Sequence, residues 1–379
     1  MMSQNSKKEL LGTIQPRYRK ANKSEKQLIL DEFVAITGYH RKYAVRILNQ
    51  WVQKRYPKKP GPQRIYQGEV VTVLERIWEI CGRICSKRLH PFLPEIVRVL
   101  ERNNELQMSA ETKKLLLQIS RSSIDRCLRL AHRVKRHGLS TTKPGTLLKR
   151  SIPVRTYTPW NEEKPGFLEI DLVAHCGDTM EGQFVNTLTC VDVSTGWTEC
   201  LAVLTRNKQT VFEAIKVVRA RLPFVLLGID SDNGSEFIND LLFQYCQYQK
   251  ITFTRSRPYY KNDQAHVEQK NWSVVRQLIG YDRFETVAEY NILQSIYTDL
   301  RLYSNFFQPV LKLISKKHVD KKVIKHYDVA ATPYQRVLAS KDIQFEVKAR
   351  LTNLYVQLNP VRLRNSIDQN VDILWKISR

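Results

Sequence analysis

Long apolar runs are missing from this 379-residue chain. No stretch approaches the roughly 18 uninterrupted apolar residues of a membrane-spanning helix, so we expect no membrane segment. The first residues, MMSQNSKKELLGTIQPRYRK, also lack the apolar core that a secretory signal requires. These absences favour a soluble protein of the cytoplasm.

Cysteine is too scattered for a disulfide framework. The seven cysteines are an odd number spread over a long chain, which favours free thiols in a reducing compartment. A zinc site can still be drawn from Cys81, Cys85, His132 and His137. However, the C-x₃-C pair lies in an apolar helical pattern and no short knuckle separates the two pairs. We therefore interpret these residues as buried thiols and surface histidines.

Acidic residues are scarce only in the first part of the chain. Residues 1–150 hold 32 Lys and Arg against 12 Asp and Glu, whereas residues 151–379 hold 29 against 25. The whole chain has a formal charge of +24, which indicates a polyanionic partner. Its length predicts two to three domains, and its composition predicts that the first part binds the polyanion.

Residues 24–50 show two helical periodicities broken at Thr37-Gly38. The expected apolar positions are Leu28, Ile29, Phe33 and Val34 in the first helix and Tyr43, Ala44, Ile47 and Leu48 in the second. This pattern fits a helix-turn-helix whose second helix carries Arg41, Lys42 and Arg46 as candidate DNA contacts. An ordinary helical hairpin with a solvated basic face fits it equally well. Residues 54–64, rich in proline and cations, predict an extended basic linker.

A second helix-turn-helix candidate covers residues 110–136. Ser122 and Asp125 predict the start of its second helix. The cations on the exposed faces of that helix are Arg121, Arg126, Arg129 and Arg133. Two such units joined by a basic arm favour binding to double-stranded DNA over a long site.

The chain changes character after this all-α region, which we assign to residues 1–137. Residues 138–165 are rich in proline, threonine, serine and glycine and predict a linker. Residues 166–335 predict a mixed sheet flanked by helices. The expected strands are 166–176, 182–193, 196–204, 224–231 and 251–258, and the expected helices are 208–222, 235–249, 263–280 and 290–310.

The last part of the chain is less regular. The basic run 315–326 is interpreted as a solvated loop or face. Residues 336–379 form a C-terminal extension of unknown role, which we expect to be partly helical and to pack on the core or dimerise.

Three carboxylates stand out in the α/β part. Asp171 lies inside an apolar strand, Asp232 follows the end of another, and Glu268 lies on a helix, with 35 residues between it and Asp232. A buried aspartate needs compensation, either from a divalent metal or from hydrogen bonds to a turn. Three oxygen ligands on three elements suit Mg²⁺, and two such ions stabilise the attacking and leaving oxygens of a phosphoryl displacement.

These residues and their surroundings resemble the D…D-x₃₅-E pattern of the retroviral-integrase and DDE transposase superfamily, which has an RNase H-like fold. The similarity covers roughly residues 160–335 and is sharpest in FLEIDLVAHCGD, GIDSDNGSEF and TFTRSRPYYKNDQAHVEQKN. The overall layout resembles bacterial insertion-sequence transposases with an integrase core. Retroviral integrases begin with an HHCC zinc module that we do not find here, which favours the transposase branch.

The resemblance implies roles for individual residues. Asp171, Asp232 and Glu268 match the family's catalytic metal ligands, with two Mg²⁺ ions expected and Mn²⁺ as a substitute. Asn271 matches a position near the active site or DNA, and Lys261 falls in a loop next to the substrate. The implied fold is an α/β RNase H-like catalytic core preceded by an all-α helix-turn-helix DNA-binding region.

Other polar residues near these motifs have simpler interpretations. Asp230 is expected at the end of its strand and Glu236 in the first turn of the following helix. We regard His175 and His266 as neighbours of the site without a catalytic role. Three acids are interpreted as loop or turn formers, namely Asp178, Glu181 and Asp192.

The expected activity is binding of element ends, metal-dependent cleavage at their 3′ ends and strand transfer into target DNA. Such a recombinase acts on two ends at once, so we expect a homo-oligomer on DNA in the prokaryotic cytosol or nucleoid. Two alternatives stay open. One is an RNase H-like nuclease that cuts without joining, and the other is a catalytically inert DNA-binding protein derived from a transposase.

Overall fold

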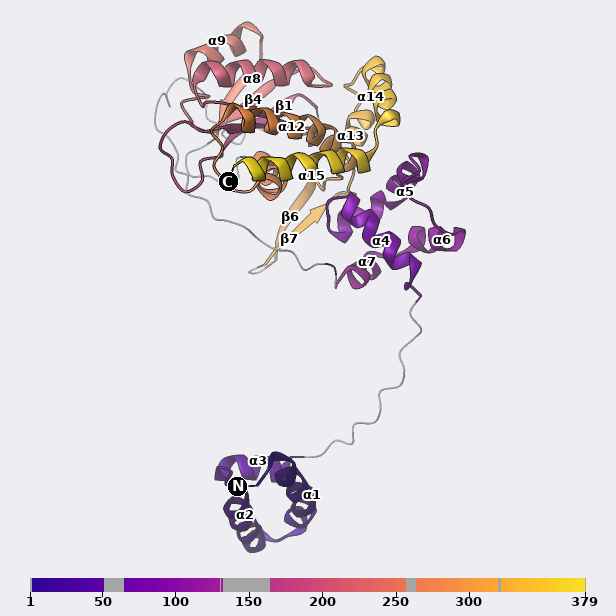
Figure 1. Ribbon diagram of the computed structural model, residues 1–379, viewed down its shortest axis with the longest axis vertical. Coiled ribbons are helices and arrows are strands. Elements are labelled where there is room, and N and C mark those ends of the chain that lie inside the picture. Colours follow the sequence, from indigo (N-terminus) through magenta and orange to yellow (C-terminus); the bar gives the residue numbers. More distant parts are fainter. Residues whose placement is uncertain are drawn as a thin grey trace. The chain divides into compact units, whose positions relative to one another are not determined.

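The computed structural model describes residues 2–50, 65–129, 131, 164–256, 264–319 and 322–378. The basic linker 54–64, most of the linker 138–165, and Lys261 therefore lie outside the described residues. The chain divides into two compact units, Met1–Arg64 and Ile65–Arg379 (Figure 1). Within the described ranges, none of the helices combines the length and apolarity needed to cross a membrane.

The first unit consists of helices α1 (Gln4–Lys20), α2 (Lys23–Thr37) and α3 (Arg41–Asn49). Asn22 and Glu25 form a capping box at the start of α2, in which each side chain accepts the other residue's backbone N–H. Gly38 ends α2 in the left-handed conformation, with φ of 68°, a region that glycine occupies without steric cost. The two helices expected over residues 24–50 and their glycine turn are therefore present.

Two of the expected core positions in this unit are wrong. Leu28 is 66% exposed and Tyr43 is 41% exposed, whereas the other apolar positions face inward or are partly buried. The reason is the additional helix α1, which contributes Tyr18 to the core. A core shared by three helices buries Leu30 of α2 in place of Leu28.

The second unit begins with α4 (Glu69–Ile80), α5 (Ser86–Arg102), α6 (Ala110–Gln118) and α7 (Arg121–Leu128). Ser120, and not Ser122, caps α7, because its side chain accepts the Ser123 N–H. Cys81 is buried as expected, but Cys85 is exposed. His132 and His137 lie outside the described residues. Since α4 contacts the C-terminal helix and shares one core with the sheet, these helices belong to the second compact unit, which begins at Ile65.

A five-stranded mixed sheet follows in the described part of this unit. Its strands are β1 (Phe167–Ala174), β2 (Asn186–Asp192), β3 (Thr198–Val203), β4 (Gly228–Ser231) and β5 (Thr252–Arg255). Their order is β3-β2-β1-β4-β5. β2 runs antiparallel to β1 and β3, whereas β1, β4 and β5 are parallel. The expected mixed sheet flanked by helices is confirmed and is consistent with the RNase H-like fold.

Helices cover both faces of this sheet, with α8 and α9 on one side and α12 on the other (Figure 1). These helices span α8 (Lys208–Arg221), α9 (Asp240–Tyr248) and α12 (Val287–Phe307). The expected helix 263–280 is a composite of α10 (Ala265–Lys270), the π-helix η1 (Asn271–Arg276) and α11 (Gln277–Ile279), and α10 contacts β1 and β2.

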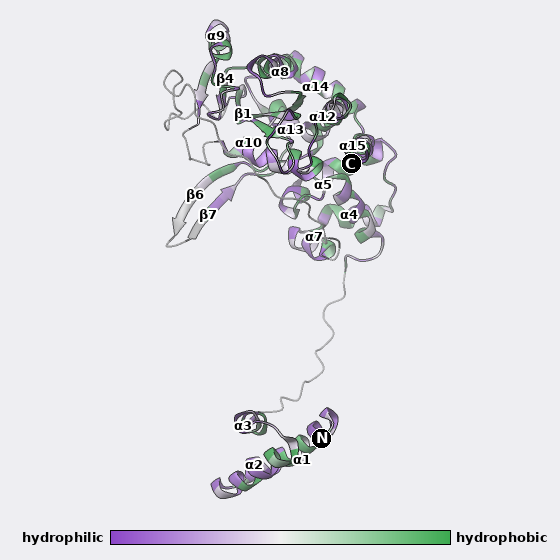
Figure 2. Cartoon of the chain, turned by 60° about the vertical axis from the view of Figure 1, so that its left-hand side comes forward, coloured by the Kyte–Doolittle hydropathy of each residue, from purple (hydrophilic) through white to green (hydrophobic). Residues whose placement is uncertain are grey.

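The C-terminal part differs from expectation in one element. The basic run 315–326 belongs to a hairpin of β6 (Leu313–Val319) and β7 (Lys322–Tyr327), not to a loop. Figure 2 shows this hairpin extending from the body of the unit. The remaining helices are α13 (Pro333–Ala339), α14 (Phe345–Gln357) and α15 (Pro360–Ile377). The extension 336–379 packs on the core, because α15 lies along α12.

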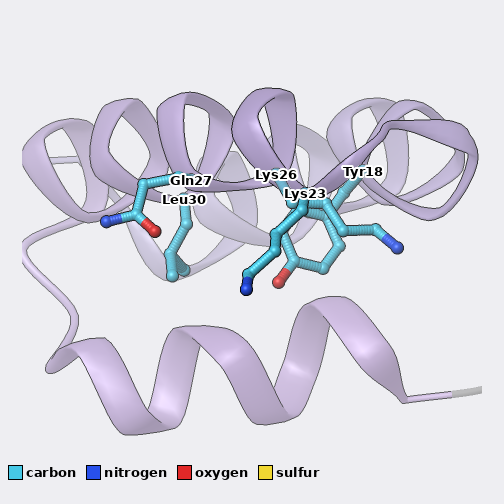
Figure 3. A pocket seen from close by; sticks show the side chains of 5 residues that line it. All are labelled: Tyr18, Lys23, Lys26, Gln27 and Leu30. Carbon is cyan, nitrogen blue, oxygen red and sulfur yellow. The ribbon is translucent and has the colours of Figure 1, made fainter.

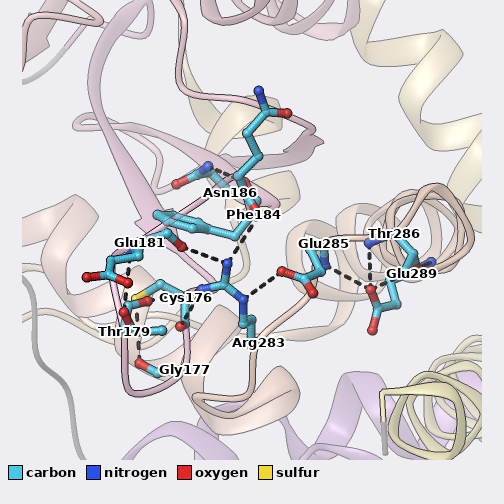
Figure 4. A network of polar contacts seen from close by, with 11 residues as sticks. Cys176, Gly177, Thr179, Glu181, Phe184, Asn186, Arg283, Glu285, Thr286 and Glu289 are labelled. Atoms are coloured by element: carbon cyan, nitrogen blue, oxygen red, sulfur yellow. Dashed lines mark hydrogen bonds and ion pairs between the residues drawn. The ribbon is translucent and has the colours of Figure 1, made fainter.

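The loop between β1 and β2 is held by a single guanidinium, that of Arg283 (Figure 4). Arg283 donates to the carbonyl oxygens of Cys176, Thr179 and Glu181 and pairs with the Glu285 carboxylate. Five N–H donors on one planar group allow this many partners at once. Asp178 and Glu181 lie in this loop with exposed side chains, which confirms them as loop residues.

Candidate active site

Two of the three predicted carboxylates meet at one edge of the sheet. β1 and β4 are adjacent parallel strands whose register pairs Glu169 with Asp230 and Ile170 with Ser231. Asp171 and Asp232 are the next residues along these two strands. They therefore come together where β4 ends, at the carboxyl edge on which open α/β sheets gather functional groups.

The electrostatics of the pair reflect this proximity. Both side chains are partly buried. Burial, followed by the negative charge of Asp232, raises the pKa of Asp171 from 3.8 to about 8. Burial also raises the pKa of Asp232. Two carboxylates so placed repel each other when ionised, and a cation between them would relieve the repulsion.

The Asp-Asn-Gly sequence fixes the position of Asp232. Its Oδ1 accepts the Gly234 N–H at 2.8 Å. Asn233 ties the same turn to β5, because its Nδ2 donates to the Ser256 carbonyl and its Oδ1 accepts from Arg255. Asp232 is thus held by a turn that is anchored to the neighbouring strand.

Glu236 was expected in the first turn of the following helix, and this expectation is wrong because α9 begins only at Asp240. Its side chain is buried and pairs with Arg206 at 2.8 Å between Oε1 and Nη2. A Cβ on Gly234 would lie 2.6 Å from the Glu236 carboxyl carbon, so glycine makes room for this side chain. The negative charge of Glu236 also raises the pKa values of Asp171 and Asp232. This long-range ion pair has no local signature in the sequence, which is why it was missed.

Glu169 is a second buried acid that sequence reasoning passed over. It lies on β1 two residues before Asp171, and its Oε2 accepts the backbone N–H groups of His266 and Val267 at 2.9 and 3.0 Å. A carboxylate is favourable at a helix N-terminus because N–H groups there have no partner within the helix. Glu169 thereby fixes the start of α10 against β1. The available signal in the sequence was a glutamate inside an apolar strand, and the structure buries that side chain to 1% exposure.

The third predicted carboxylate, Glu268, lies on α10 with an exposed side chain. One turn further, Asn271 begins the π-helix and donates from Nδ2 to Asp171 Oδ2 at 2.6 Å. π-Helical turns occur frequently at functional sites. Asn271 therefore links the helix that carries Glu268 to the edge that carries Asp171.

The carboxylate and amide oxygens at this edge are suitable ligands for a hard divalent cation. Asn271 Oδ1 is buried and has no hydrogen-bond partner among the residues described, next to two carboxylates that repel each other. Carboxylate and amide oxygens are the ligands that Mg²⁺ prefers. Within the described ranges, however, no group of three or more His, Cys, Asp or Glu side chains is arranged to hold a metal.

The residues expected to have simpler roles behave accordingly. The His175 ring is buried against Phe284 with Nε2 2.7 Å from Thr187 Oγ1, and burial lowers its pKa to about 3. Asp192 accepts from Thr195 N and Oγ1, which confirms a turn former. Asp230 lies within β4 and its Oδ1 accepts from Thr254.

The candidate DNA contacts on the helices are exposed. On α3, Arg41 pairs with Asp31, Lys42 is exposed, and the Arg46 guanidinium lies 5.0 Å from the Tyr43 ring centroid. On α7, Arg121 is exposed and Arg126 donates to Ser123.

The first unit also has a small cleft of about 360 Å³ between α1 and α2 (Figure 3). It is lined by Tyr18, Lys23, Lys26, Gln27 and Leu30. Its two lysines add to the positive charge of this unit.

Comparison with known proteins agrees with this geometry. The Integrase core domain family matches residues 161–261, which include β1 to β5, Asp171 and Asp232 and end before Glu268. The chain is 41% identical over 342 residues to the uncharacterized protein y4rM of Sinorhizobium fredii, covering 88% of this chain and 96% of that relative. The chain belongs to the same family as this relative and to the integrase and DDE transposase catalytic-core superfamily.

Proposed function

We propose that this protein is a DDE-type transposase that cleaves the 3′ ends of its element and joins them to target DNA. The observation that supports this proposal best is the pairing of Asp171 with Asp232 at the edge of a mixed sheet that matches the integrase core. Such a site serves phosphoryl transfer, which depends mainly on positioning and charge stabilisation. Water cleaves one phosphodiester at each end and frees a 3′-hydroxyl. This hydroxyl then attacks a target phosphodiester, forms a new P–O bond and displaces the target strand's 3′-oxygen, which leaves as a 3′-hydroxyl.

Asp171, Asp232 and Glu268 would hold two Mg²⁺ ions, or Mn²⁺, which when bound neutralise phosphate charge and stabilise the attacking and leaving oxygens. Asn271 positions Asp171 through its 2.6 Å hydrogen bond. Glu169 holds the start of the helix that carries Glu268.

The basic helical regions bind the DNA in this proposal. Residues 1–137 form the DNA-binding region, with helix-turn-helix units at 24–50 and 110–136, and residues 166–335 form the catalytic core. Arg41, Lys42, Arg46, Arg121 and Arg126 contact phosphates or base edges, and Lys261 and Asn271 lie next to the cleaved strand. The excess of 32 cations over 12 acids in residues 1–150 supports this assignment.

Single substitutions test the catalytic assignment. Asp171→Ala, Asp232→Ala and Glu268→Ala are each compared with wild type in nicking of labelled duplexes that carry the terminal repeats flanking the gene, with Mg²⁺ or Mn²⁺. We expect each to abolish nicking. Asp178→Ala is the matched control, since Asp178 is an exposed carboxylate in the β1–β2 loop. Near-normal nicking by one of the three variants would remove that residue from the site.

The same assay separates the alternatives. Cleavage without joined products would indicate an RNase H-like nuclease. Binding of the repeats with no metal-dependent cleavage by the wild-type protein would indicate an inert DNA-binding derivative.

We also propose that the protein acts as a homo-oligomer on DNA, because joining two ends requires two active sites. Light scattering of the complex with paired ends checks this. A complex with one protein copy per pair of ends would contradict it.

A further inference from the structure

One large aromatic side chain is left outside the core beside the candidate active site. Trp272 is 58% exposed, whereas Trp78 and Trp197 are each about 1% exposed. Trp272 directly follows Asn271, whose side chain contacts Asp171. An exposed indole at this place is open to a ligand that approaches the catalytic edge.

The helix presents this indole on the same side as Glu268. The composite helix α10–η1–α11 is anchored by a buried stripe at Val267, Lys270, Val275 and Ile279. Its opposite side exposes Glu268, Gln269 and Trp272. Glu268 and Trp272 are four residues apart, a spacing that makes two side chains neighbours on one helical face.

Two anchors hold this helix with respect to the sheet edge. Glu169 fixes its N-terminus and Asn271 ties its middle to Asp171. Trp272 lies directly after the second anchor, so its backbone position is set by the same contact that sets Asp171. A flat, exposed and positioned ring is what stacking on a nucleobase requires.

We infer that Trp272 is a nucleobase-binding residue that stacks on an unpaired base next to the cleaved phosphodiester. This inference rests on the proposed function, which places that phosphodiester at Asp171 and Asp232. Among the described residues 264–286, Trp272 is the only exposed large apolar side chain. A single exposed ring on this helix suits one base, whereas docking of another protein uses a continuous apolar patch. Stacking would hold the strand end open at the catalytic edge.

The test compares binding to two DNA probes in the absence of divalent metal, so that no cleavage occurs. One probe is a fully paired duplex, and the other has the same sequence with its last two base pairs replaced by mismatches. We expect the wild-type protein to prefer the mismatched end. We expect Trp272→Ala to weaken binding to that probe by about 5- to 150-fold, the range of one base–aromatic stack, and to leave binding to the paired probe unchanged.

Controls separate stacking from misfolding. Trp272→Phe keeps a ring and should recover most of the preference. Phe345→Ala removes a more exposed ring, 79% exposed on α14, and should behave as wild type. A 5-iodouracil in the mismatched end should photocrosslink to Trp272, as mapped by mass spectrometry.

Equal preference in wild type and Trp272→Ala, or a crosslink that maps elsewhere, would overturn the inference. A change in oligomeric state with an unchanged preference would also overturn it and would assign the ring to a protein contact. Because this experiment measures binding without cleavage, its failure leaves the roles of Asp171 and Asp232 intact. Wild-type protein that shows no metal-dependent cleavage of the terminal repeats, in contrast, would refute the proposed function itself.

Discussion

Asp171 is predicted to destabilise the metal-free protein, so Asp171→Asn should stabilise it. Burial and the charge of Asp232 raise the pKa of Asp171 from 3.8 to about 8. Each pKa unit corresponds to about 1.4 kcal/mol, so folding with this carboxyl group costs about 4 kcal/mol at neutral pH. Contact with solvent and relaxation reduce this figure, and we expect a gain of about 1 to 4 kcal/mol.

The substitution keeps the local hydrogen bonds. Asp171 accepts from Leu172 N at 2.8 Å and from Asn271 Nδ2 at 2.6 Å. An asparagine at 171 still accepts from Leu172, and rotation of the Asn271 amide lets its Oδ1 accept the new N–H. The change therefore removes a charge, while the Leu172 N–H and the new amide N–H at position 171 both keep a hydrogen-bond acceptor.

The sign of the pH dependence follows from the raised pKa. When a carboxyl group binds its proton more tightly in the folded state, the free energy of unfolding falls as pH rises from about 4 to about 8. The advantage of Asp171→Asn should therefore be absent near pH 4 and largest near pH 8.

The assay is urea unfolding followed by tryptophan fluorescence, because Trp78 and Trp197 are buried in the second unit. Added Mg²⁺ should stabilise wild type, by about 2.7 kcal/mol at one hundred times its dissociation constant, and should not stabilise Asp171→Asn. A variant that is less stable than wild type at neutral pH, or equally stabilised by Mg²⁺, would refute this reasoning.

Three further predictions concern the surroundings of the site and the DNA-binding helices. Gly234→Ala should lower the free energy of unfolding by about 1 to 3 kcal/mol, since its Cβ would meet the Glu236 carboxylate, and urea unfolding measures this. Burial lowers the pKa of His175 to about 3 in the folded state. As pH drops below about 6.5, His175 is protonated in the unfolded state but not in the folded state, so the free energy of unfolding should fall. Unfolding at pH 5 should show a loss of about 2 kcal/mol that His175→Gln removes. Replacing Lys42 and Arg46 with alanine should reduce the slope of log affinity against log salt by about one per residue, and an unchanged slope would exclude them from the interface.

The central sheet could be predicted from the sequence because its signals are local. Apolar runs bounded by turn residues indicated β1 to β5, and their alternation with helices indicated a mixed sheet. β1 and β4 are parallel neighbours in a register that pairs Ile170 with Ser231, so Asp171 and Asp232, the next residue on each, lie side by side. The pairing of these two carboxylates is thus a consequence of strand order and register.

Other features depend on contacts that have no local signal. Glu236 is held by Arg206, 30 residues earlier, and Glu169 by the N-terminus of a helix 97 residues later. The charge of residues 315–326 indicated a solvated loop or face, yet these residues form the β6–β7 hairpin. For Glu236 and Glu169 the partner that determines the side chain's position lies outside the window in which periodicity is visible.

The central claim is that Asp171 and Asp232 form the catalytic edge of a DNA-joining enzyme. The most direct measurement incubates labelled terminal-repeat duplexes with supercoiled plasmid and Mg²⁺ and counts the ends that become covalently joined. Wild type and the loop control Asp178→Asn should yield joined products, and Asp232→Asn should yield none while still binding the duplex. Joined products at wild-type level from Asp232→Asn, with the control unchanged, would contradict the account.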